Sequence, residues 1–295
     1  MAVAFVLSGG GSLGAIQVGM ARALFDRGIR PDLWVGTSVG ALNAAFLAAR
    51  PPERRAVDEL ARLWRRVRRS EVLPLRPLAG FVGFFGGRDH LVPDGGLRRL
   101  LSRELHLARL EDARTPVHIV ATALHSGRDV LLSRGPAVEA VMASLAVPGV
   151  LPPVRWGDAL LMDGGVSNNA PISHAIKLGA TDVYVLPAGA ACESSATPTS
   201  AIGMVLHALT LMLMRHLLNE IESSRARVHL IVLPPPCPQK VQATDFRHAK
   251  ELIDAGERAA RLHLDALDAG LVDSAPLFGL HHPLAGEVRV ATPMP

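Results

Sequence analysis

The sequence is poor in cysteine and aromatic residues, and each scarcity argues against a class of protein. The two cysteines, Cys192 and Cys237, have no partner at a metal-ligand spacing, so no metal centre is expected and a single disulfide stays open. The formal charge is +4 and the pI is 9.7, but aromatic residues are only 4% and are not interleaved with basic ones. We therefore expect no nucleic-acid partner, and interpret the charge as solubility plus contact with an anionic surface.

The chain also lacks the segments that direct or anchor a protein in a membrane. The first apolar run, Ala2 to Leu7, follows no basic residues and leads directly into glycines, which is not the pattern of a signal peptide. The longest apolar stretch, Ile202 to Leu218, is interrupted by His207 and Arg215 and is too short for a transmembrane helix. We expect a cytoplasmic or peripherally membrane-associated protein, with export by a route without a cleaved signal left open.

Short apolar runs alternate with segments of helical spacing, which is typical of an α/β fold with a mostly parallel central sheet. Strands are expected at residues 2–7, 32–35, 117–124, 130–133, 154–156, 160–162, 182–186 and 228–233. Helices are expected at residues 13–27, 39–49, 53–69, 94–107, 136–146, 172–177, 202–223 and 246–269. We predict one domain over residues 1–270, a poorly patterned tail over 271–295, and a small polar linker over 188–200.

Two glycine-rich turns follow the first two predicted strands. Gly9, Gly11 and Gly14 form a G-x-G-x-x-G pattern, and residues 36–40 form G-x-S-x-G around Ser38. A strand-to-helix elbow with small residues on either side exposes the serine oxygen, so Ser38 is a candidate nucleophile. The ends of neighbouring parallel strands share one edge of a sheet, where ligands bind, so the two glycine turns are expected to lie together. Asp163-Gly164-Gly165 completes the set, and the three motifs are expected in one domain because they need a common site.

A dinucleotide-binding site is the first alternative for the glycine loop. That fingerprint also needs an acidic residue at the end of the next strand, about 20 residues on. Asp32 begins that strand, whereas Gly36 and Ser38 occupy its end, which counts against a nicotinamide or flavin enzyme. An ordinary hydrolase triad is the second alternative, but His118, His125 and His174 have no recognisable catalytic setting.

The three glycine-containing blocks resemble the signature motifs of the patatin-like phospholipases. Residues 143–148, Ala-Ser-Leu-Ala-Val-Pro, and residues 166–171, Val-Ser-Asn-Asn-Ala-Pro, resemble the family segments before and after the aspartate. The resemblance covers residues 2–186 in the family's order. It implies a three-layer α/β/α fold and a Ser-Asp dyad without histidine, metal or cofactor.

Carried over residue by residue, the resemblance implies Ser38 as nucleophile and Asp163 as general base. It implies an oxyanion hole from the amides of Gly10, Gly11 and Ser12, with motif glycines Gly9, Gly14, Gly36, Gly40 and Gly164. Many members carry arginine or lysine where this chain has Leu13, which puts strong binding of phosphorylated head groups in doubt. The implied activity is lipase or phospholipase A type ester hydrolysis through an acyl-enzyme on Ser38. A lipid acyltransferase, or a low-turnover lipid-binding regulatory module of the same fold, is the alternative.

Other segments bear on lipid contact or compete with the dyad. Residues 53–69 predict a basic amphipathic helix, interpreted either as a contact for anionic lipid head groups or as a solvated face. Residues 80–87 place phenylalanines among glycines, typical of a lipid-facing loop or of a buried loop. Asp94-Gly95-Gly96 is a second D-G-G, and we interpret Asp94 as a helix N-cap. The expected partners are a lipid or phospholipid substrate and, peripherally, a membrane; the oligomeric state is not predicted.

Overall fold

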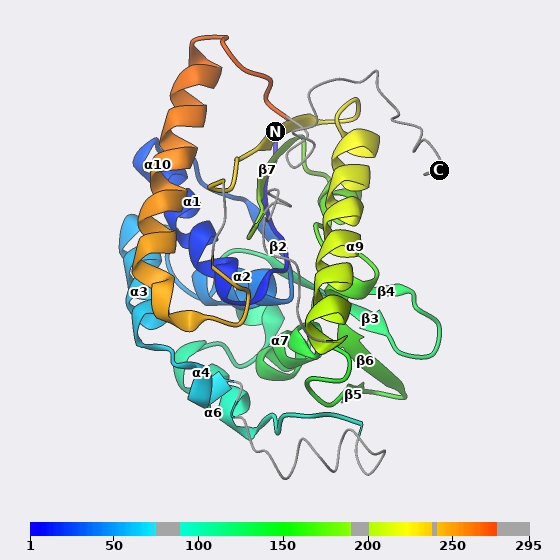
Figure 1. Cartoon of the computed structure of the whole chain (residues 1–295). Helices are drawn as coiled ribbons and strands as arrows, with labels where there is room; N and C mark the ends of the chain where they lie inside the picture. The colour runs from blue at the N-terminus through cyan, green and yellow to red at the C-terminus, as the bar shows by residue number, and fades with distance from the viewer. Residues whose placement is uncertain (73, 75–88, 190–200, 238–240, 276–295) are drawn as a thin grey trace, which may run out of the picture.

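The structure is a computed structural model that describes residues 1–72, 74, 89–189, 201–237 and 241–275 (Figure 1). The predicted phenylalanine–glycine loop, most of the predicted linker, Cys192, and the tail beyond Ala275 lie outside the described residues. Cys237 is disulfide-bonded, and Cys192 is the only other cysteine of the chain. No helix in the described parts is both long enough and apolar enough to cross a membrane.

The centre of the molecule is a mixed sheet in the order β5-β6-β3-β2-β1-β7-β8, with β4 paired to β3 outside that path. Neighbours from β3 to β8 in this order are parallel, whereas β4 and β6 are antiparallel to β3, and β5 is antiparallel to β6. The strands are β1 Val3–Leu7, β2 Leu33–Thr37, β3 Val117–Ala123, β4 Asp129–Leu132, β5 Val154–Trp156, β6 Ala159–Asp163, β7 Asp182–Leu186 and β8 His229–Val232. The predicted mostly parallel sheet is confirmed.

Helices cover both faces of the sheet, as three layers require. Alternate residues of β1 serve the two sides: Phe5 and Leu7 belong to one buried cluster, and Ala4 and Val6 to the other. The first cluster is completed by α1 Ala15–Asp26, α2 Val39–Ala48, α3 Arg54–Arg66, α6 Gly95–Glu104, α7 Ala137–Leu145 and α10 Ala249–Asp268. The second cluster is completed by α8 Ile172–Lys177 and α9 Ala201–Ser224. The three-layer α/β/α prediction is confirmed.

The pairing of β3 brings two strand ends together. Along β3, Ile119 to Thr122 pair with β4 on one edge. The opposite edge of β3 pairs with two strands in succession. β2 pairs with the first part of β3 and ends with Thr37 opposite Val120. β6 pairs with the remaining part, where its last residue, Asp163, lies opposite Ala121. Since β2 and β6 run in opposite directions along this edge, their final residues meet head to head. This register places the residue after Thr37 next to Asp163.

The predicted basic helix forms as α3, but its apolar side is not available to a membrane. Its six buried residues lie in the first core cluster: Ala56, Val57, Leu60, Ala61, Leu63 and Trp64. An interfacial helix must place its apolar face in lipid. Only the arginine-rich face of α3 is therefore exposed for contact with other molecules.

Two local predictions differ from the structure in detail. Asp94 occupies the N-cap position of α6, but its carboxylate accepts from Arg98 Nε at 2.6 Å and makes no capping bond to a backbone amide. The first residues of the predicted tail, up to Ala275, pack on the domain: Ala275 is buried in the second cluster, and the Val232 amide donates to the Ser274 carbonyl at 2.7 Å.

Candidate active site

Ser38 occupies a strained elbow between β2 and α2. Its backbone lies at φ 54° and ψ −123°, in the left-handed region that L residues avoid. A Cβ at Gly36 would lie 2.5 Å from the Gly40 carbonyl oxygen, and one at Gly40 would lie 2.2 Å from that of Leu7. The close approach of these backbones requires glycine at both motif positions. The elbow is thus held from both sides, and such strain is typical of functional positions.

Ser38 and Asp163 form a direct hydrogen-bonded pair. The Ser38 hydroxyl donates to Asp163 Oδ2 at 2.6 Å, and the Gly165 amide donates to Asp163 Oδ1 at 2.7 Å. Both residues are buried, with 8% and 5% of their surfaces exposed. Gly164 lets this turn lie against β3, because a Cβ there would be 2.1 Å from the Val120 carbonyl oxygen. These contacts hold the Asp163 carboxylate within hydrogen-bond distance of the Ser38 hydroxyl proton.

Burial sets the acidity of Asp163. Desolvation raises the pKa of its carboxyl to about 6, and the hydrogen bonds from Ser38 and the Gly165 amide oppose this rise. A carboxylate with a raised pKa is a stronger base than a solvated one, while it remains largely ionised at neutral pH. The same burial that makes Asp163 costly to ionise makes it suited to accept a proton.

The glycine loop after β1 passes the nucleophile at Gly9, where a Cβ would lie 3.1 Å from Ser38 Cβ. The Gly9 amide donates to the Asn169 carbonyl at 3.2 Å and to its side-chain oxygen at 3.1 Å. The Ser12 amide donates to the Ala243 carbonyl at 2.7 Å, so the prediction of a third oxyanion-hole donor at Ser12 is corrected. Among the described residues, the Gly10 and Gly11 amides have no acceptor.

Ser144 holds the backbone of the nucleophile. The Ser38 amide donates to Ser144 Oγ at 2.8 Å, and the Ser144 hydroxyl donates to the Val120 carbonyl at 2.5 Å. Ser144 is fully buried on α7, within the segment that carried the family resemblance. It links the elbow to the same β3 residue at which β2 ends, so nucleophile and base share one anchor on β3.

A buried polar network supports the glycine loop from behind. Trp64 Nε1 donates to Asn43 Oδ1 at 2.9 Å, and Asn43 Nδ2 donates to the Gly14 carbonyl and to Gln17 Oε1. Gln17 Nε2 donates to the carbonyls of Ser8 and Leu186, at 2.8 and 2.9 Å. Gly14 packs against Val39 and Trp64. The network ties α1, α2 and α3 to the loop and to the end of β7.

The sequence predictions missed the supporting residues Gln17, Asn43, Ser144 and Asn169. Gln17 and Asn43 carried a readable signal, because each is an amide surrounded in its helix by apolar residues and must find partners when buried. Ser144 and Asn169 were noticed only as members of segments resembling the family. Their partners come from distant parts of the chain, and spacing alone does not reveal them.

In the part of the chain that the structure describes, neither His118 and His174 nor a metal-ligand cluster belongs to this arrangement. His118 contacts Ser133 Oγ at 2.7 Å, and His174 contacts Asp129 Oδ2 at 2.5 Å; neither hydrogen-bonds to the dyad. Among the described residues, no three side chains of the histidine, cysteine, aspartate and glutamate types gather as a metal site. The site as described can carry out acyl transfer through a serine nucleophile and a carboxylate base.

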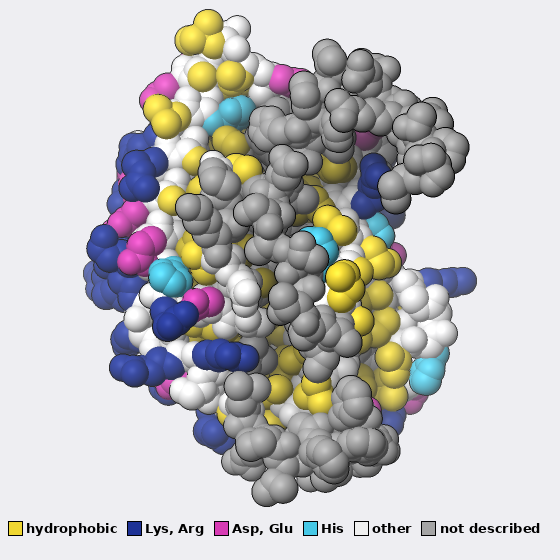
Figure 2. Space-filling view, in the orientation of Figure 1, with side chains coloured by type: hydrophobic (Ala, Val, Ile, Leu, Met, Phe, Trp, Pro, Cys, Tyr) yellow, Lys and Arg dark blue, Asp and Glu magenta, His cyan; other side chains and the backbone are white. Residues whose placement is uncertain are grey.

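Helix α9 borders the site from the other sheet face. Leu213 of α9 lies by the aspartate turn, 3.0 Å from where a Gly165 Cβ would be. Four apolar side chains of the same helix are exposed: Met204, Val205, Leu211 and Met212. Figure 2 shows hydrophobic side chains gathered along this helix. The helix that contacts the aspartate turn therefore also carries exposed apolar side chains.

The sequence of the chain matches a known protein family. The family model for patatin-like phospholipase matches residues 5–176, which is more than half of the chain. The chain belongs to the patatin-like phospholipase family. This membership supports a lipid hydrolase function.

Curated relatives match about two thirds of the chain. The chain is 31% identical over 202 residues to patatin-like phospholipase domain-containing protein 7 of Rattus norvegicus, and 30% identical over 194 residues to protein 6 of that series from Homo sapiens. It is 27% identical over 203 residues to lysophospholipase NTE1 of Mycosarcoma maydis. These matches cover 65–66% of this chain but only 10–14% of the relatives. The chain thus corresponds to a small part of those proteins.

Solved structures also match at low sequence identity. VipD from Legionella pneumophila aligns with a TM-score of 0.46 and 13% identity, covering 90% of this chain and 67% of VipD. Human GIVD cytosolic phospholipase A2 aligns with a TM-score of 0.46 and 12% identity, covering 92% and 60%.

Proposed function

We propose that the protein is a serine acyl hydrolase that cleaves carboxylic ester bonds of lipids. One observation carries the proposal: the 2.6 Å hydrogen bond from the Ser38 hydroxyl to buried Asp163, formed at a strained elbow. A nucleophile and base within hydrogen-bond reach are the minimum for acyl-enzyme chemistry. Membership of the patatin-like phospholipase family supports the lipid ester as the substrate class.

In the first half-reaction, Ser38 Oγ attacks the ester carbonyl carbon while Asp163 takes its proton. The carbonyl oxygen becomes an oxyanion, and in this proposal the amides of Gly10 and Gly11 donate to it. The intermediate collapses when the bond to the alcohol oxygen breaks, and Asp163 returns the proton to that oxygen. The alcohol leaves, and the acyl group remains as an ester of Ser38.

In the second half-reaction, water replaces the alcohol. Asp163 removes one proton from the water as its oxygen attacks the acyl carbon, and the same two amides stabilise the new oxyanion. The bond to Ser38 Oγ breaks, Ser38 recovers its proton from Asp163, and the carboxylic acid departs. Asp163 alone serves as acid and base, so the proposed cycle needs no histidine.

The proposal is tested with variants of the pair on p-nitrophenyl butyrate and on phospholipid vesicles. Ser38→Ala and Asp163→Asn should each lower kcat/KM by about 10³-fold or more, and the double variant should be scarcely worse, because members of a catalytic unit are not additive. Asp158→Asn, an exposed aspartate in the same β5–β6 hairpin, is the matched control and should retain wild-type rates.

Near-normal turnover by Asp163→Asn would assign the base to another residue. A fluorophosphonate probe that fails to label the wild-type protein would instead favour a low-turnover lipid-binding module. Product analysis with added glycerol separates hydrolysis from acyl transfer, because an acyltransferase would form glyceryl ester in place of free acid.

A further inference from the structure

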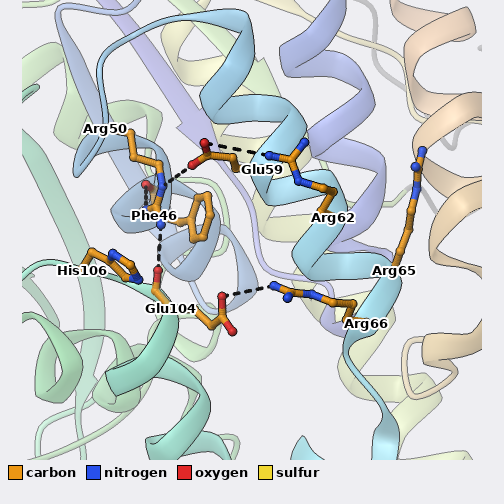
Figure 3. A pocket seen from close by; sticks show the side chains of 8 residues that line it. All are labelled: Phe46, Arg50, Glu59, Arg62, Arg65, Arg66, Glu104 and His106. Carbon is orange, nitrogen blue, oxygen red and sulfur yellow. Dashed lines mark hydrogen bonds and ion pairs between the residues drawn. The ribbon is translucent and has the colours of Figure 1, made fainter.

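A second hollow lies at the far end of α2 from the nucleophile. Ser38 precedes the first residue of α2, whereas Phe46 in its last turn and Arg50 just beyond it line a cavity of about 440 Å³. The remaining walls come from α3 and from the end of α6: Glu59, Arg62, Arg65, Arg66, Glu104 and His106 (Figure 3). This volume is within the range of small-molecule sites.

Arg50 forms the fixed floor of the cavity. Its guanidinium lies 3.5 Å from the centre of the Phe46 ring and donates to the carbonyls of Phe46, Glu104 and Leu105 at 2.8–3.2 Å. Its Nε donates to Glu59 at 3.2 Å. Four of its five N–H donors are used by the protein, so Arg50 contributes mainly positive charge and shape.

The outer wall carries more positive charge than its carboxylates balance. Glu59 is shared by Arg50, Arg55 and Arg62, with Arg62 at 3.9 Å. Glu104 is shared by Arg66 at 3.4 Å and Arg103 at 2.8 Å. Arg65 makes no ion pair with any described residue. Arg62 and Arg66 are held at long distances and are exposed, so their guanidinium forks remain accessible from solvent.

Helical spacing places two of the outer arginines together. Arg62 and Arg66 are four residues apart on α3, which puts them on one face of the helix, whereas Arg65 points away from them (Figure 3). A planar guanidinium presents paired donors that match phosphate oxygens in two-point contacts, and several of them together favour a ligand with more than one phosphate charge. His106 lies at the rim with φ 55°, the only non-glycine residue besides Ser38 with positive φ in the described chain.

We propose that this cavity is a binding site for a multiply charged phosphate group, separate from the catalytic centre. The group is carried either by a soluble polyphosphate or by a lipid with a phosphomonoester head. Arg62 and Arg66 bind its oxygens, and Arg50 adds positive charge at the floor of the cavity. The proposal does not depend on the proposed hydrolysis, because none of these side chains touches Ser38 or Asp163.

Calorimetric titration with sodium triphosphate tests the site. Wild type and Ser38→Ala should bind equally, and Arg62→Gln/Arg66→Gln should bind at least 10-fold more weakly. The matched control is Arg68→Gln/Arg69→Gln, which removes the same charge from the next exposed residues and should stay within 2-fold of wild type. Glu59→Gln should tighten binding, because it releases Arg62 from a competing carboxylate. Thermal unfolding verifies that each variant is folded.

Vesicle sedimentation distinguishes the source of the phosphate. Vesicles with phosphatidic acid are compared with phosphatidylglycerol vesicles of equal charge. Arg62-dependent preference for phosphatidic acid, with or without triphosphate binding, supports the site and identifies a lipid head as a ligand. Triphosphate binding without that preference supports a soluble ligand. Absence of both, or equal loss in the Arg68/Arg69 control, overturns the proposal.

Discussion

At the scale of single residues, the acidity of Asp163 links catalysis to stability. If Asp163 is the base, it must be ionised to act, and burial raises its pKa to about 6. We expect kcat/KM for a soluble ester to rise with pH through about 6 and then level off. The measurement is a pH–rate profile with p-nitrophenyl butyrate. A profile that is flat between pH 5 and 8 would contradict the assignment.

The same shift predicts how stability depends on pH. The pKa of Asp163 is higher in the folded than in the unfolded chain, so the folded state binds more protons between about pH 4 and 6, and stability falls as pH rises across this window. A rise of about two units corresponds to about 3 kcal/mol. Asp163→Asn lacks this titration. Denaturant unfolding at several pH values should show that the free energy of unfolding of the variant, relative to that of wild type, increases up to about pH 6 and is constant above it.

Gln17 is predicted to position the glycine loop without touching substrate. Gln17→Met keeps the side-chain volume but removes both donors to the Ser8 and Leu186 carbonyls. A displaced oxyanion hole weakens transition-state binding more than ground-state binding. We expect kcat to fall about 10-fold with KM little changed, and stability to fall by about 1–3 kcal/mol. Kinetics and denaturant unfolding measure both effects.

Trp64→Phe provides the graded comparison, because it removes one donor at the distal end of the same network. Its kcat should fall less than that of Gln17→Met. If Gln17→Met is destabilised while its kcat equals that of wild type, the loop is held by other contacts and the positioning role is wrong.

At the scale of elements, α9 is the surface we expect to meet aggregated lipid. Met204 and Leu211, and Val205 and Met212, are seven residues apart, so the exposed side chains form one stripe beside the aspartate turn. Leu211→Gln/Met212→Gln should lower activity on phospholipid vesicles several-fold more than activity on monomeric ester. The ratio of the two rates is the measurement.

Leu262→Gln/Leu271→Gln is the control for α9. These leucines are also exposed, at 70% and 77%, but lie in and just after α10. They should leave the ratio unchanged. If both pairs alter the ratio equally, the response reflects general surface hydrophobicity and α9 has no special part in lipid contact.

At the scale of the whole molecule, the arginine-rich surface and the apolar surface lie on different parts of the protein. In Figure 2 the arginines gather on the side of α3, and the hydrophobic side chains gather over α9. The sequence predicted the arginine-rich face but could not show that the apolar side of α3 is consumed by the core. That outcome depends on α1 and α10 packing against it, which is a contact between distant segments.

The elements and the dyad candidates were predictable because their signals are local. A few adjacent residues determine the strand ends, the glycine turns and the elbow around Ser38. The engagement of the Ser12 amide by Ala243, and the cavity between α3 and α6, were not predictable, because each joins segments whose separation in space is set by the folded sheet. The Ser38–Asp163 pairing itself was accessible only through the family resemblance.

The head-to-head meeting of β2 and β6 has a consequence for how the site is assembled during folding. The elbow joins two adjacent elements, β2 and α2, whereas its partner carboxylate lies 125 positions later along the chain, on a hairpin joined to β3 through three residue pairs. The segment between β3 and β6 must be ordered for this pairing, and the conformational entropy lost is offset when the ladder forms. We therefore expect the Ser38–Asp163 hydrogen bond to form only after β6 has joined the edge of β3.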